Sequence, residues 1–122
     1  MGKRALLVED ELLIALDLQG IIEDTGLTVD GPYIDVAGSL EAIGTALPDV
    51  AVLDVSLRGG DVFPLADRLH QLGVPILFHS GHADTGSLNR RYPGSAVISK
   101  PGSPAQLAAR LRELTQQEPK GG

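Results

Sequence analysis

The chain has 122 residues, of which 43% are hydrophobic and 21% charged, and its formal net charge is −6. This length is typical of one domain with one core, and the acidic balance and 3% aromatic content argue against direct nucleic-acid binding. The absence of cysteine excludes disulfides and thiolate metal sites, and no apolar stretch reaches the roughly 20 residues of a membrane span. We therefore expect a cytoplasmic protein with no membrane contact.

The first half of the chain predicts two strands, each followed by a helix. The run at 5–8 is continuously apolar, as is typical of a strand covered on both faces. The run at 28–34 is interrupted by Gly31 and Pro32, and because proline donates no hydrogen bond to a ladder, we expect this strand at a sheet edge or bend. The two helical stripes are Ile14, Leu18, Ile21 and Ile22, and then Leu40, Ile43 and Leu47.

The second half continues the alternation. Apolar runs at 50–53, 76–78 and 96–98 predict three further buried strands. Two more helical stripes are Val62, Leu65, Ala66 and Leu69, and then Leu107, Ala108, Leu111 and Leu114, the last helix being capped by Ser103 before Pro104. Segment 83–95 is poor in apolar residues, so we expect a short or mobile helix there, or only a turn. Residues 116–122 are polar, and we expect them to form a flexible tail.

This order of strands and helices predicts a doubly wound α/β fold. Strands that alternate with helices form a parallel sheet with right-handed crossovers and helices on both faces. We expect five strands and a single domain over residues 1–122, with no room for an appended output domain.

Reactive side chains follow four of the predicted strands. Glu9 and Asp10 follow the first run, Asp54 follows the run at 50–53, and Ser80 and Lys100 follow the last two. In open parallel sheets, ligands bind beyond the carboxyl ends of the strands. Carboxylates held close together must take up protons or share a cation, and hard oxygen ligands suit Mg²⁺. A carboxylate beside such a cation can act as a nucleophile toward a phosphoryl donor, with an ammonium and a hydroxyl stabilising the transferring oxygens.

This constellation resembles the response-regulator receiver domain of bacterial two-component signalling over essentially the whole chain. The motifs that carry the resemblance are Leu7-Val8-Glu9-Asp10-Glu11, Val52-Leu53-Asp54-Val55-Ser56-Leu57 with Gly59-Gly60, Ser80-Gly81, and Ser99-Lys100-Pro101. One such motif alone would be a weak signal, whereas four in order are a strong one. The resemblance implies a flavodoxin-like fold with strand order 2-1-3-4-5.

The resemblance also implies a role for each site residue. Asp54 matches the phosphoacceptor, and Asp10 matches the main acidic ligand of Mg²⁺ or Mn²⁺. Glu9 matches a second acid that acts through water, and Ser56 would lend its backbone carbonyl to the metal. Ser80 matches the switch hydroxyl.

Lys100 matches the lysine that pairs with the acceptor or its phosphate, and the peptide bond from Lys100 to Pro101 is cis in this family. The chain departs from the family pattern at Arg58, where proline is common, and at Val97 and Gly102, where aromatic residues are common. We therefore expect an atypical output face, in which the usual coupling of hydroxyl and aromatic ring does not carry over.

The function that the resemblance implies is transfer of a phosphoryl group from a histidine kinase or phosphotransfer protein to Asp54. Such a domain signals through contacts with a downstream protein, and homodimerisation is possible. It is no enzyme in the ordinary sense, because it catalyses only its own phosphorylation and dephosphorylation. Two alternatives are a pseudo-receiver, which would be an unphosphorylated interaction module, and a nucleotide-binding enzyme. The second is disfavoured because Glu9-Asp10-Glu11 replaces a glycine-rich phosphate loop.

Several polar residues have simpler interpretations. Glu11 suits a helix N-terminus, where negative charge is stabilising. His79 should point away from Ser80 into packing, because side chains alternate along a strand. The resemblance implies that His82, two positions after Ser80, could tune the lifetime of the acyl phosphate or act as a pH-sensitive contact. We expect His70 to be structural or exposed, and we expect three aspartates to be helix caps or surface charges: Asp61, Asp67 and Asp84.

Overall fold

The computed structural model describes residues 2–57, 60–81 and 85–116, in which strands and helices alternate along the chain. The strands are β1 (Arg4–Val8), β2 (Thr28–Tyr33), β3 (Val50–Asp54), β4 (Ile76–Ser80) and β5 (Ala96–Ser99). The helices are α1 (Leu12–Asp24), α2 (Val36–Thr45), α3 (Phe63–Gln71), α4 (Thr85–Arg91) and α5 (Pro104–Thr115). Among the described residues, no helix combines the length and hydropathy that crossing a membrane would require.

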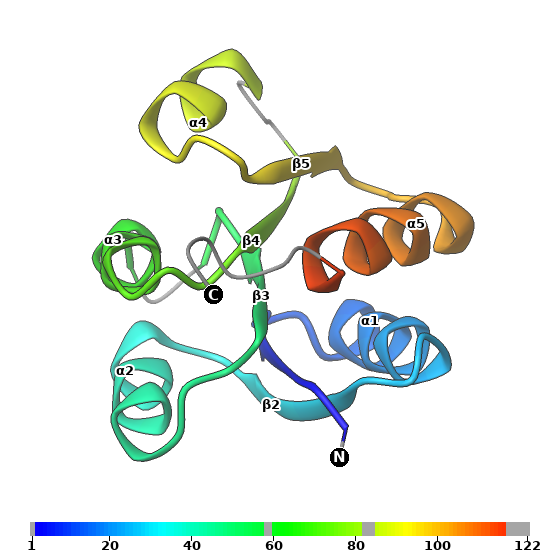
Figure 1. Ribbon diagram of the computed structural model, residues 1–122, viewed down its shortest axis with the longest axis horizontal. Helices are drawn as coiled ribbons and strands as arrows, with labels where there is room; N and C mark the ends of the chain where they lie inside the picture. The colour runs from blue at the N-terminus through cyan, green and yellow to red at the C-terminus, as the bar shows by residue number, and fades with distance from the viewer. Residues whose placement is uncertain (1, 58–59, 82–84, 117–122) are drawn as a thin grey trace.

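The five strands form one parallel sheet in the order β2-β1-β3-β4-β5. Helices α1 and α5 cover one face of this sheet, and α2, α3 and α4 cover the other (Figure 1). The flavodoxin-like α/β fold and the strand order expected from the sequence are both confirmed. The prediction of a single domain with a flexible tail concerns residues beyond the described ones and stays a prediction.

Two apolar clusters fill the spaces on either side of the sheet. Successive side chains of β1 point to opposite faces, so Leu6 and Val8 join the cluster under α2, α3 and α4, whereas Ala5 and Leu7 join the cluster under α1 and α5. All four are fully buried. This two-sided burial explains why the run at 5–8 is continuously apolar rather than alternating.

Strand β2 lies at the edge of the sheet, as the glycine and proline within it predict. Its pairing with β1 is in register from Arg4 and Thr28 onward but shifts between Leu6 and Val8. At this shift Gly31 has a φ of +122°, and a Cβ added there would lie 2.5 Å from the carbonyl oxygen of Leu7. Only glycine fits this bend without strain.

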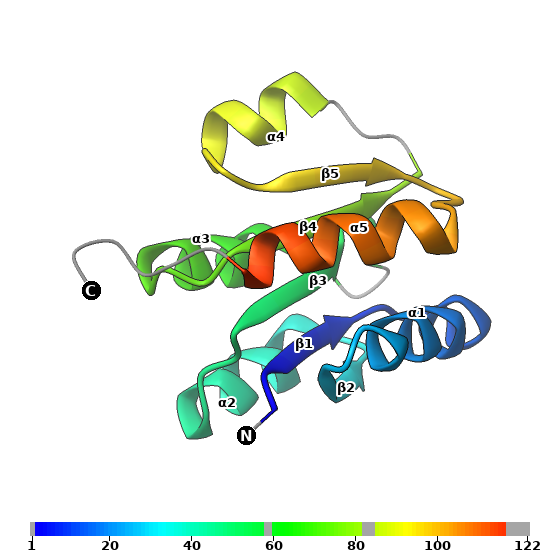
Figure 2. The same ribbon diagram turned by 45° about the vertical axis from the view of Figure 1, so that its right-hand side comes forward.

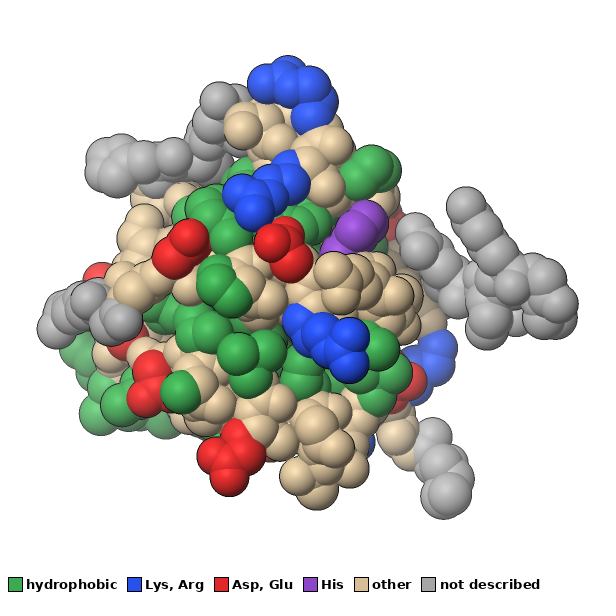
Figure 3. Space-filling view, turned by 90° about the vertical axis from the view of Figure 1, so that its left-hand side faces the viewer, with side chains coloured by type: hydrophobic (Ala, Val, Ile, Leu, Met, Phe, Trp, Pro, Cys, Tyr) green, Lys and Arg blue, Asp and Glu red, His purple; other side chains and the backbone are tan. Residues whose placement is uncertain are grey.

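Helix α4 is short, with seven residues, which confirms a short helix within segment 83–95. The buried ring of Tyr92 follows it, and the Tyr92 hydroxyl donates a 2.6 Å hydrogen bond to Asp67 on α3. Arg91 also pairs with Asp67 and lies 4.5 Å above the ring of Phe63. These contacts of Asp67 with Tyr92 and Arg91 therefore join α4 to α3. Basic, acidic and hydrophobic side chains are interspersed on the face formed by α2, α3 and α4 (Figure 3).

Helix α5 begins as its sequence predicts. Pro104 lies at its first position, and the Ser103 side chain accepts a hydrogen bond from the backbone N–H of Gln106 at 3.1 Å. The helix buries Leu107 and Leu111 against the sheet. The loop that precedes α5, which carries Lys100, is therefore fixed at both ends by regular structure.

Candidate functional site

The carboxyl ends of the strands lie at one end of the sheet (Figure 2). Three acids come together there. Glu9 and Asp10 follow β1, and Asp54 ends β3, the strand that pairs with β1. One carboxylate oxygen from each of the three residues lies within 4.8 Å of the others. Glu9 and Asp54 are buried and Asp10 is half-buried. The acidic pocket expected from the sequence is therefore present.

Lys100 places its ammonium between two of these acids. Its Nζ lies 3.2 Å from Oε1 of Glu9 and 3.2 Å from Oδ2 of Asp54. Burial opposes a charged amine, but the negative charges of Asp54 and Glu9 outweigh this effect and raise the pKa of Lys100 above its ordinary value. Lys100 is thus a protonated cation that faces two buried carboxylates.

Glu9 is the most perturbed acid of the site. Its side chain is fully buried, and burial followed by the hydrogen bond to Asp54 raises its pKa to about 7. The backbone N–H of Glu11, which donates to Oε2 at 3.1 Å, and the charge of Lys100 act in the opposite direction without cancelling the shift. Among the described residues, Oε1 makes no well-aligned hydrogen bond despite its proximity to Lys100.

These residues fit a hard divalent cation. A single ammonium faces two buried carboxylates, and a third carboxylate lies beside them. Mg²⁺ prefers oxygen ligands and commonly binds one or two protein carboxylates together with phosphate oxygens. The acids lie close enough together to surround one ion. A bound cation would relieve the repulsion among the three negative charges.

The comparison with known families agrees with the fold and with this pocket. The family model described as the response regulator receiver domain matches residues 5–112. The chain belongs to this family. Receiver domains generally act as signalling modules rather than as enzymes, and the Glu9, Asp10 and Asp54 pocket is consistent with their phosphoacceptor site.

Similar proteins include longer regulatory proteins. The transcriptional regulatory protein DltR of Streptococcus agalactiae is 34% identical over 93% of this chain and 52% of its own length. The phyllosphere-induced regulator PhyR of Methylorubrum extorquens is 30% identical over 89% of this chain and 42% of its own. The receiver chain therefore spans about half the length of the curated relatives it matches.

Solved structures also match the whole fold. A response regulator receiver protein from Sinorhizobium medicae has a TM-score of 0.83 at 26% identity, with 93% of this chain and 94% of that chain covered. The receiver domain of PhyR from Erythrobacter litoralis has a TM-score of 0.83 at 21% identity, with coverage of 99% and 97%. The second match bears on the fold alone.

The other expected site residues of this receiver domain also lie at the carboxyl ends of the strands. Ser80 is buried at the end of β4, where its carbonyl oxygen accepts a 2.8 Å hydrogen bond from the backbone N–H of Lys100. The backbone N–H of Ser56 donates to Oδ1 of Asp54 at 3.0 Å. The Lys100–Pro101 peptide bond is cis, as the resemblance implies. The structure thus brings these residues together, whereas their chemical roles stay predictions.

His79 lies behind the site, in packing. It is 4% exposed, and its Nε2 accepts a 3.3 Å hydrogen bond from the backbone N–H of Gly102. Burial, and then the charge of Lys100, lower the pKa of His79 below its ordinary value. The placement expected for His79 is therefore confirmed. His82, Arg58 and Asp84 lie outside the described residues.

Two features of this receiver domain were not predicted from the sequence. Asp67, expected as a cap or surface charge, is partly exposed but also accepts the Tyr92 hydroxyl, and this hydrogen bond lowers the pKa of Asp67. The second is a hollow beside His79 between α1 and α5. Its one sequence signal is Gly102, where the family resemblance led us to expect an aromatic residue.

Proposed function

We propose that this receiver domain accepts a phosphoryl group on Asp54 from a histidine kinase or phosphotransfer protein and signals through contact with a downstream protein. The observation that carries the proposal is the cluster of three carboxylates within 4.8 Å, two of which lie 3.2 Å from the Lys100 ammonium. Homodimerisation and a cytoplasmic location belong to the same proposal, as does the restriction of catalysis to the domain's own phosphorylation and dephosphorylation.

The chemistry assigned to Asp54 is nucleophilic attack on phosphorus. One carboxylate oxygen forms a bond to phosphorus while the phosphorus–nitrogen bond of a phosphohistidine donor breaks. The electron pair stays on the released imidazole nitrogen, which takes up a proton from solvent. The product is an acyl phosphate, which water later cleaves to restore the carboxylate.

The residues around Asp54 support this step by position and charge. Asp10, Asp54, the backbone carbonyl of Ser56 and, through water, Glu9 would hold Mg²⁺ or Mn²⁺. When bound, this cation would neutralise charge on the transferring oxygens. Lys100 already lies against Asp54 and can pair with one phosphoryl oxygen. Ser80, at the end of the adjacent strand, can donate its hydroxyl to another.

A titration with beryllofluoride and Mg²⁺, followed by amide NMR, distinguishes this function from that of a pseudo-receiver. Beryllofluoride mimics a phosphoryl group on a carboxylate, so we expect saturable shifts around Asp54, Ser80 and Lys100. Asp54→Asn removes the charged oxygen that would bind beryllium and should abolish these shifts. A spectrum of the unaltered chain that stays unchanged at saturating beryllofluoride would support the pseudo-receiver instead.

The assigned metal ligands are tested separately by the affinity for Mg²⁺. Asp10→Asn removes one of three clustered carboxylates, and we expect it to weaken Mg²⁺ binding by about tenfold or more. Asp24→Asn removes an exposed carboxylate at the far end of α1 and serves as the matched control. Equal affinities in the two variants would refute the role of Asp10.

A further inference from the structure

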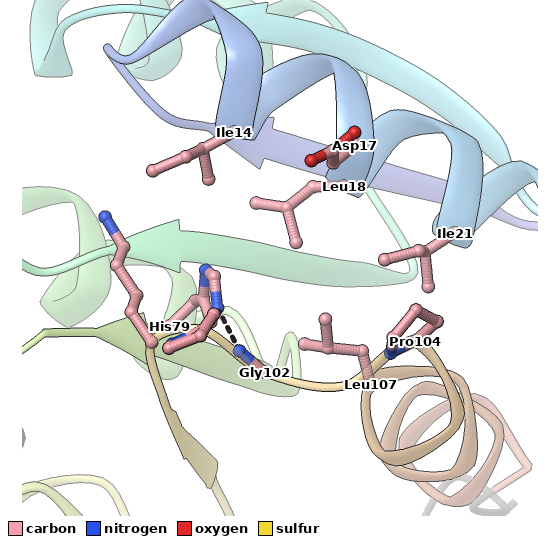
Figure 4. A pocket seen from close by; sticks show the side chains of 10 residues that line it. Ile14, Asp17, Leu18, Ile21, His79, Gly102, Pro104 and Leu107 are labelled. Carbon is pink, nitrogen blue, oxygen red and sulfur yellow. Dashed lines mark hydrogen bonds between the residues drawn. The ribbon is translucent and has the colours of Figure 1, made fainter.

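A hollow of about 400 Å³ lies between α1 and α5, next to the loop that carries Lys100. Its wall on the α1 side consists of Ile14, Leu18 and Ile21, and Leu107 lies opposite them on α5 (Figure 4). Volumes of about 300–1,000 Å³ with mainly apolar walls and a few placed polar groups are typical of small-molecule sites. The size and lining of this hollow therefore fit a small organic molecule.

His79 supplies a buried polar group inside this hollow. Because its Nε2 accepts the hydrogen bond from the backbone N–H of Gly102, the ring hydrogen lies on Nδ1. Nδ1 is buried and has no hydrogen-bond partner among the described residues. Figure 4 shows this nitrogen on the side of the ring away from Gly102, directed toward Ile14 and Leu18 of α1. Buried donors are nearly always paired in native proteins, so an unpaired one indicates a missing acceptor.

Gly102 preserves this arrangement. A Cβ at this position would lie 2.7 Å from Cγ2 of Ile98 and 3.2 Å from Cγ of Leu107. The distance to Ile98 is shorter than real Cβ atoms show, so a side chain at this position would force Ile98 or Leu107 to move and would change the wall of the hollow. The glycine thus holds both the tautomer of His79 and the shape of the hollow.

The charges around the hollow favour an uncharged ligand. Asp17 lies at its rim and is exposed, and the chain has a net charge of −6. The side chain of Lys100 also lines the hollow. Its ammonium is already paired with two acids of the phosphoacceptor site. An anionic ligand would meet repulsion with no free cation among the described lining residues to offset it, whereas an ammonium or guanidinium group has no lone pair with which to accept the hydrogen from His79.

We propose that the hollow between α1 and α5 binds an uncharged, mainly apolar small molecule whose carbonyl or similar oxygen accepts the hydrogen of His79 Nδ1. The apolar part of the ligand packs against Ile14, Ile21 and Leu107. This site adjoins the acidic pocket, with which it shares Lys100, but its ligand contacts none of the three acids, and binding can be measured on the unphosphorylated chain. A test of binding is therefore independent of the proposed function.

Three probes of similar size separate the contributions to binding. Acetophenone has an aromatic ring and a carbonyl, ethylbenzene lacks the acceptor, and benzoate carries a negative charge. Titrated into ¹⁵N-labelled protein, acetophenone should shift the amides of Ile14, Ile21, Gly102 and Leu107 in a saturable way. One buried hydrogen bond predicts that it binds about tenfold more tightly than ethylbenzene. Benzoate should bind more weakly than acetophenone.

Two variants and a matched control locate the binding. His79→Phe removes the donor and should reduce acetophenone to the affinity of ethylbenzene. Ile21→Trp fills the hollow from α1 and should abolish binding, whereas Leu16→Trp, at a 51% exposed position on the same helix, should leave it unchanged. If His79→Phe does not fold, as judged by circular dichroism, the two tryptophan variants still show whether acetophenone binds in the hollow. Equal affinities for acetophenone and ethylbenzene, binding unaffected by Ile21→Trp, or no saturable shifts at all would overturn the proposal.

Discussion

Lys100 forms ion pairs with two buried acids, so one positive charge faces two negative charges in the site. Its Nζ lies 3.2 Å from both Glu9 and Asp54. One positive charge cannot fully compensate two buried negative charges, and the pKa of Glu9 rises to about 7 as a result of its burial and of Asp54. In the absence of a metal ion, Glu9 therefore carries a proton over much of the mildly acidic range.

The raised pKa of Glu9 predicts how stability depends on pH in the metal-free protein. The pKa of 4.5 in the unfolded chain rises to about 7 on folding, so the stabilisation from protonated Glu9 is complete below pH 4.5 and is lost as the pH rises through about 7. The loss amounts to about 3 kcal/mol. Urea unfolding in chelator, compared between the unaltered chain and Glu9→Gln, measures it. Parallel stability curves for the two proteins across this range would contradict the prediction.

The two partners of Lys100 also predict opposite effects of two substitutions. Asp54→Ala leaves a single pair between Lys100 and Glu9, so we expect the metal-free protein to become more stable, by about 1 kcal/mol. Lys100→Ala leaves two buried acids without their cation and should destabilise the fold by about 2 kcal/mol or more. Thermal unfolding in chelator checks both. A sharp fall in melting temperature for Asp54→Ala would show that repulsion among the acids is not the dominant effect.

At the scale of single elements, the edge strand β2 depends on the backbone of Gly31. Its φ of +122°, together with the 2.5 Å that would separate an added Cβ from the carbonyl oxygen of Leu7, excludes a side chain. We expect Gly31→Ala to lower the free energy of unfolding by about 2 kcal/mol or more. Gly20 lies in α1, and a Cβ added there would meet open space. Gly20→Ala should therefore raise the free energy of unfolding by about 0.5–1 kcal/mol. Urea unfolding of both variants tests this; a neutral Gly31→Ala would mean that the strand relaxes easily.

Helix α4 shows how tertiary contacts can support an element that its sequence favours only weakly. Segment 83–95 has few apolar residues, yet Leu88 and Tyr92 are both buried. The Tyr92 hydroxyl reaches Asp67 on α3, and Arg91 stacks on Phe63. The sequence predicted a short helix because of its glycine, asparagine and proline content, but it could not predict the partners on α3, which lie about 25 positions earlier in the chain.

At the scale of the whole molecule, the sheet topology and the position of the site at the carboxyl ends of the strands were predictable for the same reason. Continuous apolar runs mark strands covered on both faces, and parallel strands place their carboxyl ends at one edge. Asp54 and Lys100 could therefore be placed together from the sequence. The division of Lys100 between two acids and the hollow beside His79 could not be predicted, because both depend on side-chain distances of a few ångströms across separate elements.

Borohydride trapping tests most directly whether Asp54 carries the phosphoryl group. The protein is incubated with phosphoramidate and Mg²⁺, treated with sodium borohydride, which reduces an aspartyl phosphate to homoserine, and then sequenced by mass spectrometry. We expect homoserine at position 54 in samples with Mg²⁺ and none after chelation or in Asp54→Asn. Homoserine at Asp10 instead, or none anywhere despite Mg²⁺, would contradict the assignment of Asp54 as the phosphoacceptor.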